Sequence, residues 1–173
     1  FLFAPKFHPA MKHAIGPRRE LGQRTIFNLL GPLTNPAYTT HLLVGVYDPS
    51  LTRPFAEVIG GLGGKAAYVV HSQGGYDELT TCSKNIISQL KDGQVTTFEL
   101  DTTSLGLRIA NQEDLRGGTP EENAARMRDL FSGKDQTALR DVVILNAAAA
   151  LALCDHFDLQ GSLEKAREAL DNG

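Results

Sequence analysis

Two apolar segments on either side of an amphipathic one place the strongest constraint on the fold of this chain. His41 to Tyr47 and Lys65 to Val70 are typical of buried strands, and Leu51 to Leu62 is typical of a helix that ends in glycines. Ser50 is expected to cap this helix. A strand, a helix and a strand at this spacing form a βαβ unit, whose strands are parallel. The sequence therefore predicts an α/β fold.

The residues after this unit predict a mixed, partly parallel sheet flanked by helices. Thr80 to Leu90 and Val95 to Leu100 are typical of strands, and the Lys-Asp-Gly turn between them indicates an antiparallel hairpin. Thr119 and Glu122 have the spacing of a capping box at the start of a helix. Three helices are expected, from Thr119 to about Ser132, from Thr137 to Phe157, and from Ser162 to Leu170.

The first forty residues follow a less regular pattern. Phe1 to Ala4 is predicted to be a strand, and Pro9 to Leu21 a helix with a break at Gly16-Pro17. The chain starts without a methionine and inside this expected strand, so we expect a fragment of a longer protein. No repeat, low-complexity tract or linker is visible, and residues 1–173 are expected to form one domain.

Composition excludes several classes of function. The 17 basic and 20 acidic residues give a net charge of -3, which argues against a strongly basic nucleic-acid-binding surface. The 2 cysteines are too few for a disulfide framework or a cysteine zinc site, which favours a reducing cytoplasm. The longest apolar run, Val142 to Cys154, is shorter than the ~20 residues of a membrane span. We therefore expect neither nucleic acid nor a membrane as a partner.

The decapeptide His71 to Thr80 contains the clearest candidate metal site. It follows the second apolar strand and places a glycine pair directly before a tyrosine and the adjacent acids Asp77 and Glu78. Mg²⁺ prefers oxygen ligands and is commonly bound by one or two carboxylates together with substrate phosphates. The alternative interpretation is a solvated acidic turn, because acids are common beside turn glycines.

A second candidate site lies in the segment rich in proline, glycine, asparagine and arginine that precedes the βαβ unit. Arg18 and Arg19 can clamp a planar carboxylate or a phosphate, because guanidinium groups form paired hydrogen bonds with such anions. The alternative is that both arginines are solvated on a helix face.

Two long motifs in this chain together resemble the anthranilate phosphoribosyltransferase family. The first extends from Phe7 to Pro36 and reads Phe-His-Pro-Ala-Met-Lys, then Pro-Arg-Arg-Glu-Leu-Gly, then Thr-Ile-Phe-Asn-Leu-Leu-Gly-Pro-Leu-Thr-Asn-Pro. The second is Gly-Gly-Tyr-Asp-Glu-Leu-Thr. A later Leu-Arg-Gly-Gly-Thr-Pro-Glu-Glu-Asn-Ala run and the alanine-rich helix also fit. The resemblance spans the chain and implies that residues 1–173 are the C-terminal part of an incomplete nucleoside phosphorylase/phosphoribosyltransferase-like catalytic domain.

The resemblance implies a reaction of tryptophan biosynthesis, in which the phosphoribosyl group of phosphoribosyl pyrophosphate (PRPP) passes to the amine of anthranilate and pyrophosphate is released. The implied cofactor is Mg²⁺, ligated by Asp77 and Glu78 and bound to PRPP. Arg18 would hold the anthranilate carboxylate. The path of the aromatic substrate would be lined by His8, Met11 and the Gly31-Pro32 turn. His8 has an alternative role as the cap of the helix expected from Pro9.

Parts of the family pattern are not matched within this chain. The family's N-terminal helical domain and its Gly-Thr-Gly-Gly-Asp pyrophosphate loop have no counterpart in residues 1–173. The resemblance implies a homodimer formed through those upstream helices, and we expect residues 1–173 alone to be inactive. Two alternatives stay open, a pyrimidine nucleoside phosphorylase and a transferase-like nucleic-acid-binding protein without synthesis activity.

Overall fold

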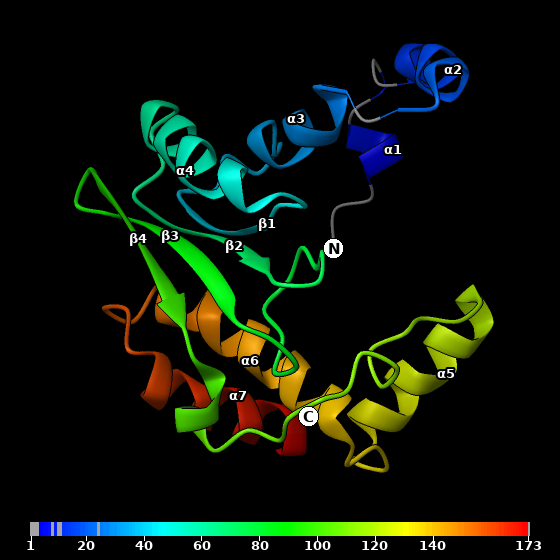
Figure 1. Ribbon diagram of the computed structural model, residues 1–173, viewed down its shortest axis with the longest axis vertical. Helices are drawn as coiled ribbons and strands as arrows, with labels where there is room; N and C mark the ends of the chain where they lie inside the picture. Colours follow the sequence, from blue (N-terminus) through cyan, green and yellow to red (C-terminus); the bar gives the residue numbers. More distant parts are fainter. Residues whose placement is uncertain (1–3, 8, 10–11, 24, 173) are drawn as a thin grey trace. The chain divides into compact units, whose positions relative to one another are not determined.

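The computed structural model describes residues 4–7, 9, 12–23 and 25–172 of the chain (Figure 1). The chain divides into two compact units, residues 1–39 and residues 40–173. We call them the N-terminal unit and the sheet unit. The described part of the N-terminal unit is helical, and the sheet lies wholly in the other unit.

The sheet has four strands in the order β1-β2-β3-β4. Their bounds are β1 His41–Gly45, β2 Ala66–Ser72, β3 Asn85–Lys91 and β4 Gln94–Leu100. β1 and β2 are parallel, whereas β2 with β3 and β3 with β4 are antiparallel. The βαβ unit, the hairpin and the mixed sheet are therefore confirmed.

Helices cover both faces of this sheet (Figure 1). Helix α4 (Thr52–Gly61) packs on one face, and helices α6 (Ala138–Ala152) and α7 (Leu159–Asn172) pack on the other. Every residue of β2 is buried, because both of its faces are covered. The core beneath α6 and α7 includes Tyr68, Val70, Leu79, Leu145, Ala148 and Leu163.

The start of α4 corrects one expectation from the sequence. The cap is Asp48, not Ser50: the Ser50 backbone N–H donates to Asp48 Oδ1 over 2.9 Å. Asp48 thereby caps a short 3₁₀ turn, Pro49–Leu51, that leads into α4. The acidic side chain bonds to the backbone two residues further on, which is the usual behaviour of aspartate at a turn.

Other helix ends agree more closely with the sequence. Helix α5 (Pro120–Phe131) begins with the predicted capping box, in which the Thr119 N–H donates to Glu122 Oε2 over 2.7 Å and the Glu122 N–H donates to Thr119 Oγ1 over 3.3 Å. Helix α6 ends at Ala152 rather than at Phe157. His156 and Phe157 have positive φ angles of 53° and 65°, a conformation that cannot continue a right-handed helix.

The N-terminal unit contains α1 (Ala4–Phe7), α2 (Lys12–Leu21) and α3 (Phe27–Leu33). Ala4 begins a helix, so the predicted strand is wrong at that residue, and residues 1–3 lie outside the described part. The predicted break at Gly16-Pro17 is also wrong, because α2 continues through Pro17. The proline removes one hydrogen bond, to the carbonyl of His13, in a helix that is open to solvent on that side.

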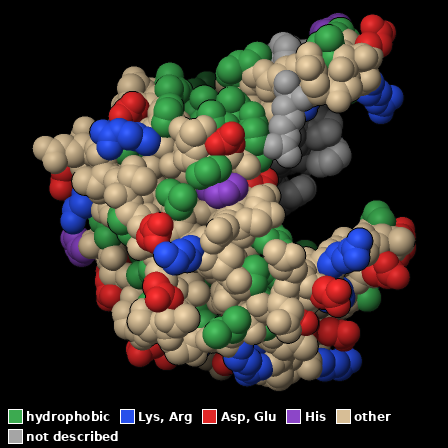
Figure 2. Space-filling model, in the orientation of Figure 1, with side chains coloured by type: hydrophobic (Ala, Val, Ile, Leu, Met, Phe, Trp, Pro, Cys, Tyr) green, Lys and Arg blue, Asp and Glu red, His purple; other side chains and the backbone are tan. Residues whose placement is uncertain are grey.

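The surface of the sheet unit carries charges of both signs. Figure 2 shows acidic and basic side chains interspersed over its visible face. Cys82 and Cys154 are both free thiols. Among the described helices, none has the combination of length and apolar character that crossing a bilayer requires.

Candidate functional site

Asp77 and Glu78 lie in the loop between β2 and β3, after the glycine turn that follows β2, and both residues are exposed. The loop folds back on Ser72, whose N–H donates to the Tyr76 carbonyl over 3.0 Å. Gly74 and Gly75 make this reversal possible, because their φ angles of 103° and 92° strain any residue with a side chain. The glycine turn thus places the two acids near the end of a buried strand.

The backbone that follows the acidic pair is fixed by two asparagine side chains. Asn146 of α6 accepts from the Leu79 N–H over 3.0 Å and donates to the Leu79 carbonyl over 2.7 Å. Asn85 of β3 accepts from the Thr80 N–H over 2.8 Å and donates to the Thr80 carbonyl over 3.0 Å. Both backbone groups of two successive residues are therefore satisfied by side chains. The sequence predicts that this strand starts at Thr80, but β3 starts at Asn85. The reason is that side chains, and not a neighbouring strand, bind the backbone at Thr80.

The electrostatics of the pair favour a bound cation. Although Glu78 as a whole residue is exposed, the protein atoms around its carboxyl group remove part of its hydration and raise its pKa. The charge of Asp77 and a hydrogen bond with it raise that pKa further. Two carboxylates this close repel one another when both are ionised, and a divalent cation between them relieves the repulsion. The residues present therefore fit Mg²⁺.

The acidic pair offers two carboxylate ligands to a cation. Within the described residues, no group of three or more histidine, cysteine, aspartate or glutamate side chains is arranged to hold a metal ion. If Mg²⁺ binds to Asp77 and Glu78, its other coordination positions are left to water or to substrate phosphate oxygens. Mg²⁺ sites in phosphate-handling enzymes are commonly of this kind.

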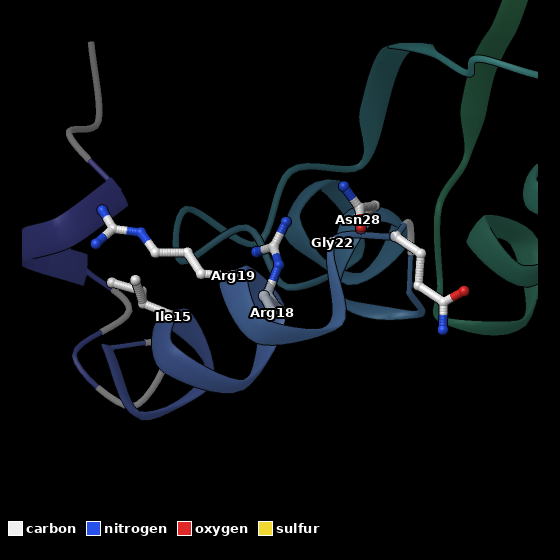
Figure 3. A pocket seen from close by; sticks show the side chains of 6 residues that line it. Ile15, Arg18, Arg19, Gly22 and Asn28 are labelled. Atoms are coloured by element: carbon white, nitrogen blue, oxygen red, sulfur yellow. The ribbon is translucent and has the colours of Figure 1, made fainter.

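The N-terminal unit holds a separate pocket around Arg18, with a volume of about 390 Å³ (Figure 3). Arg18 lies in the last turn of α2 and is partly buried, whereas Arg19 is exposed. Figure 3 shows the two guanidinium groups leaving the helix in different directions. The pocket is lined by Ile15, Arg18, Arg19, Gly22, Gln23 and Asn28.

Local hydrogen bonds shape this pocket. The Gly22 N–H donates to the Arg18 carbonyl over 3.2 Å, and the positive φ of 60° at Gly22 ends the helix there. Asn28 is held by the Thr25 N–H, which donates to its Oδ1 over 2.9 Å. In the part of the chain that the structure describes, no carboxylate is ion-paired with Arg18 or Arg19. Both guanidinium groups thus keep their capacity to bind an anion.

Of the remaining predicted site residues, the structure describes Gly31 and Pro32. Gly31 and Pro32 belong to the last turn of α3, so the turn predicted there is wrong; the Gly31 carbonyl accepts from the Thr34 N–H that ends the helix. Neither residue lines the pocket around Arg18. His8 and Met11 lie outside the described residues.

Sequence reasoning missed the two asparagines that hold the loop. Asn146 had a detectable signal, because it is the one strongly polar side chain in the apolar run Val142 to Cys154. A polar side chain that is partly buried among apolar residues needs hydrogen-bond partners, and for Asn146 one partner is the backbone at Leu79. Asn85 had no comparable signal, because the Thr80 backbone comes within its reach only through the conformation of the loop.

The chain is similar over its whole length to known proteins. A family model described as the glycosyl transferase family, a/b domain, matches residues 1–173. The anthranilate phosphoribosyltransferase of Moorella thermoacetica is 51% identical over 174 residues, which cover 100% of this chain and 51% of that protein.

Solved structures give the same picture. The anthranilate phosphoribosyltransferase of Thermus thermophilus superposes with a TM-score of 0.87 at 43% identity, covering 98% of this chain and 50% of that one. The enzyme from Saccharomyces cerevisiae in complex with PRPP and Mg superposes with a TM-score of 0.83 at 26% identity, covering 94% of this chain and 47% of that one. The chain thus spans about half the length of the relatives that it matches.

Proposed function

Since this chain belongs to the glycosyl transferase family through its a/b domain, we propose that it forms the C-terminal part of the catalytic domain of an anthranilate phosphoribosyltransferase. The reaction transfers the phosphoribosyl group of PRPP to the amine of anthranilate and releases pyrophosphate. Relatives of that name at about half identity support the proposal, as does the likeness of the fold to solved enzymes of that name.

The observation that carries the proposal is the acidic pair on its fixed loop. Asp77 and Glu78 would hold Mg²⁺ together with phosphate oxygens of PRPP, and the hydrogen bonds to Leu79 and Thr80 would keep the two carboxylates in place. A bound Mg²⁺ supplies charge neutralisation for a pyrophosphate leaving group. The task of the protein side chains is then positioning and electrostatic stabilisation, and no covalent nucleophile is required.

Arg18 is the proposed partner of the anthranilate carboxylate. Its guanidinium is partly buried in the pocket of the N-terminal unit and is ion-paired with no described carboxylate, so it can form paired hydrogen bonds with a planar anion. Gly31 and Pro32, with His8 and Met11, are proposed to line the path of the aromatic ring. A homodimer remains a prediction from the family resemblance, and a cytoplasmic location remains a prediction from the small number of cysteines.

The direct test uses the full-length protein that contains this chain. Phosphoribosyl anthranilate formation is measured at several Mg²⁺ concentrations for the wild type, Asp77→Asn, Glu78→Gln and the control Glu164→Gln, an exposed residue of α7. We expect kcat/KM to fall by about 100-fold or more in the first two variants, because ligands of the leaving-group cation act on the transition state, and to be unchanged in the control.

Full activity in both acidic-pair variants would contradict the proposal. Two other results would favour the alternatives. Thymidine phosphorolysis by the full-length protein would point to a nucleoside phosphorylase. Salt-sensitive DNA binding without any turnover would point to a nucleic-acid-binding relative.

A further inference from the structure

Gly45, the last residue of β1, lies directly against the backbone of Asp77. A Cβ atom built on Gly45 would lie 1.4 Å from the Asp77 carbonyl oxygen, 2.4 Å from its carbonyl carbon and 3.1 Å from its Cα. All three are backbone atoms, so no rotation of a side chain would relieve the contact. Any other residue at position 45 would displace the backbone of Asp77.

The usual reasons for a glycine do not apply at this position. The φ angle of Gly45 is not in the positive range, so its backbone conformation is open to other residues. Gly45 pairs with Val70 in the regular register between β1 and β2, with no bulge. A glycine inside a strand weakens the strand and often marks a place where another backbone approaches closely. At Gly45 that approaching backbone belongs to the candidate cation site.

We propose that Gly45 is a positioning residue for the cation site formed by Asp77 and Glu78. Because Gly45 has no side chain, the backbone of Asp77 can pack directly against the end of β1. This contact sets the position of the Asp77 backbone, from which the carboxylate projects. Asn146 and Asn85 fix the loop after the acidic pair, and Gly45 fixes it at the pair itself. This inference rests on the proposed function of the pair as a Mg²⁺ site.

The test compares two glycine-to-alanine variants of the full-length protein that contains this chain. Gly45→Ala introduces the collision with Asp77. Gly61→Ala is the matched control, because a Cβ there would meet no atom within 4 Å. Mn²⁺ serves as a paramagnetic probe for the Mg²⁺ site, and its binding is followed through the broadening of assigned backbone amide resonances. Thermal unfolding of each variant is recorded alongside.

We expect Mn²⁺ to broaden the amides of Asp77 and Glu78 in the wild type and in Gly61→Ala at the same concentrations. In Gly45→Ala the apparent Kd should rise by about 10- to 100-fold, the cost typical of disturbing residues that orient metal ligands. The amide resonances around Asp77 should shift, while those of the core residue Leu163 should not.

Equal Mn²⁺ affinity in Gly45→Ala and wild type would overturn the role of Gly45 and leave the cation site intact. Absence of broadening at Asp77 and Glu78 in the wild type would instead remove the cation site, and with it any role of Gly45 there. A Gly45→Ala variant that does not fold would assign Gly45 to the stability of the sheet and overturn the proposal. Nuclear Overhauser contacts between the α-protons of Gly45 and Asp77 in the wild type provide an independent check; their absence would also overturn it.

Discussion

The two units hold their candidate residues in different ways. In the sheet unit, Asp77 and Glu78 sit on a loop whose backbone is fastened by hydrogen bonds to the sheet and to α6. In the N-terminal unit, Arg18 lies on α2, a helix with no buried residue among those described, and Ile15 beside it is 48% exposed. Precise positioning requires packed surroundings. The comparison indicates that the acidic pair is held in place by its own unit, whereas Arg18 is held less firmly by its unit.

The largest difference in unfolding free energy should be between side-chain truncations in the two units. Leu145 is fully buried beneath the sheet, so Leu145→Ala should cost about 2–5 kcal/mol of unfolding free energy through lost burial and a cavity. Ile15→Ala in α2 should cost less than about 1 kcal/mol, because its side chain is already half in water. Urea unfolding of both variants measures the difference, and equal costs would break the comparison.

The next effect concerns the asparagine that fastens the loop. Asn146→Ala removes three hydrogen bonds and should cost about 1–3 kcal/mol, with faster hydrogen exchange at the Leu79 amide. Asn123→Ala is the control, since Asn123 holds Gly118 by the same reciprocal pair of bonds on an exposed surface. It should cost less and leave the Leu79 amide unchanged. Slow exchange at Leu79 in Asn146→Ala would show that the loop does not depend on Asn146.

A change of pH should distinguish cation binding by the acidic pair from anion binding by Arg18. The raised pKa of Glu78 means that it takes up a proton at a higher pH than an ordinary glutamate, whose value is 4.5. A protonated carboxyl group is a poor ligand for a hard cation. Mn²⁺ binding should therefore begin to weaken at a pH above 4.5 and weaken further as the pH falls to 4.5. A guanidinium keeps its charge over this range. Mn²⁺ affinity that stays constant down to about pH 4.5 would contradict the coupling between Glu78 and Asp77.

The smallest effect on stability should come from Arg18. Arg18→Gln removes a charge from the surface of α2 that forms no ion pair with a described carboxylate, so the unfolding free energy should change by no more than about 0.5 kcal/mol. In the full-length protein the same variant should raise the KM for anthranilate with little change in the KM for PRPP. A large loss of stability would mean that Arg18 is structural.

Periodicity and turn chemistry were sufficient to predict the sheet unit in outline. Apolar runs indicate the βαβ unit, the Lys-Asp-Gly turn indicates the hairpin, and the spacing of Thr119 and Glu122 indicates the helix that they cap. These signals are local in sequence, and so they can be read without the fold. The N-terminal unit was predicted less well, because a single proline such as Pro17 weakens an exposed helix without ending it.

The supports of the acidic pair could not be predicted from local patterns. Gly45 is an ordinary strand residue until the fold brings Asp77 against it, and Asn146 is 67 residues away in sequence from the Leu79 backbone that it holds. The roles of Arg18, Asp77 and Glu78 remain predictions, carried by motifs and by the chemistry of carboxylates and guanidinium groups. Contacts between residues that are far apart in sequence leave no local pattern, so they cannot be predicted from a single sequence.

The decisive measurement for the acidic pair is an anomalous difference map from crystals of the 173-residue chain grown with Mn²⁺ and pyrophosphate. We predict a manganese peak bound by carboxylate oxygens of both Asp77 and Glu78, with pyrophosphate oxygens completing its coordination. A well-ordered loop with no peak at this pair, or a peak held by other residues, would show that the pair is not a divalent-cation site.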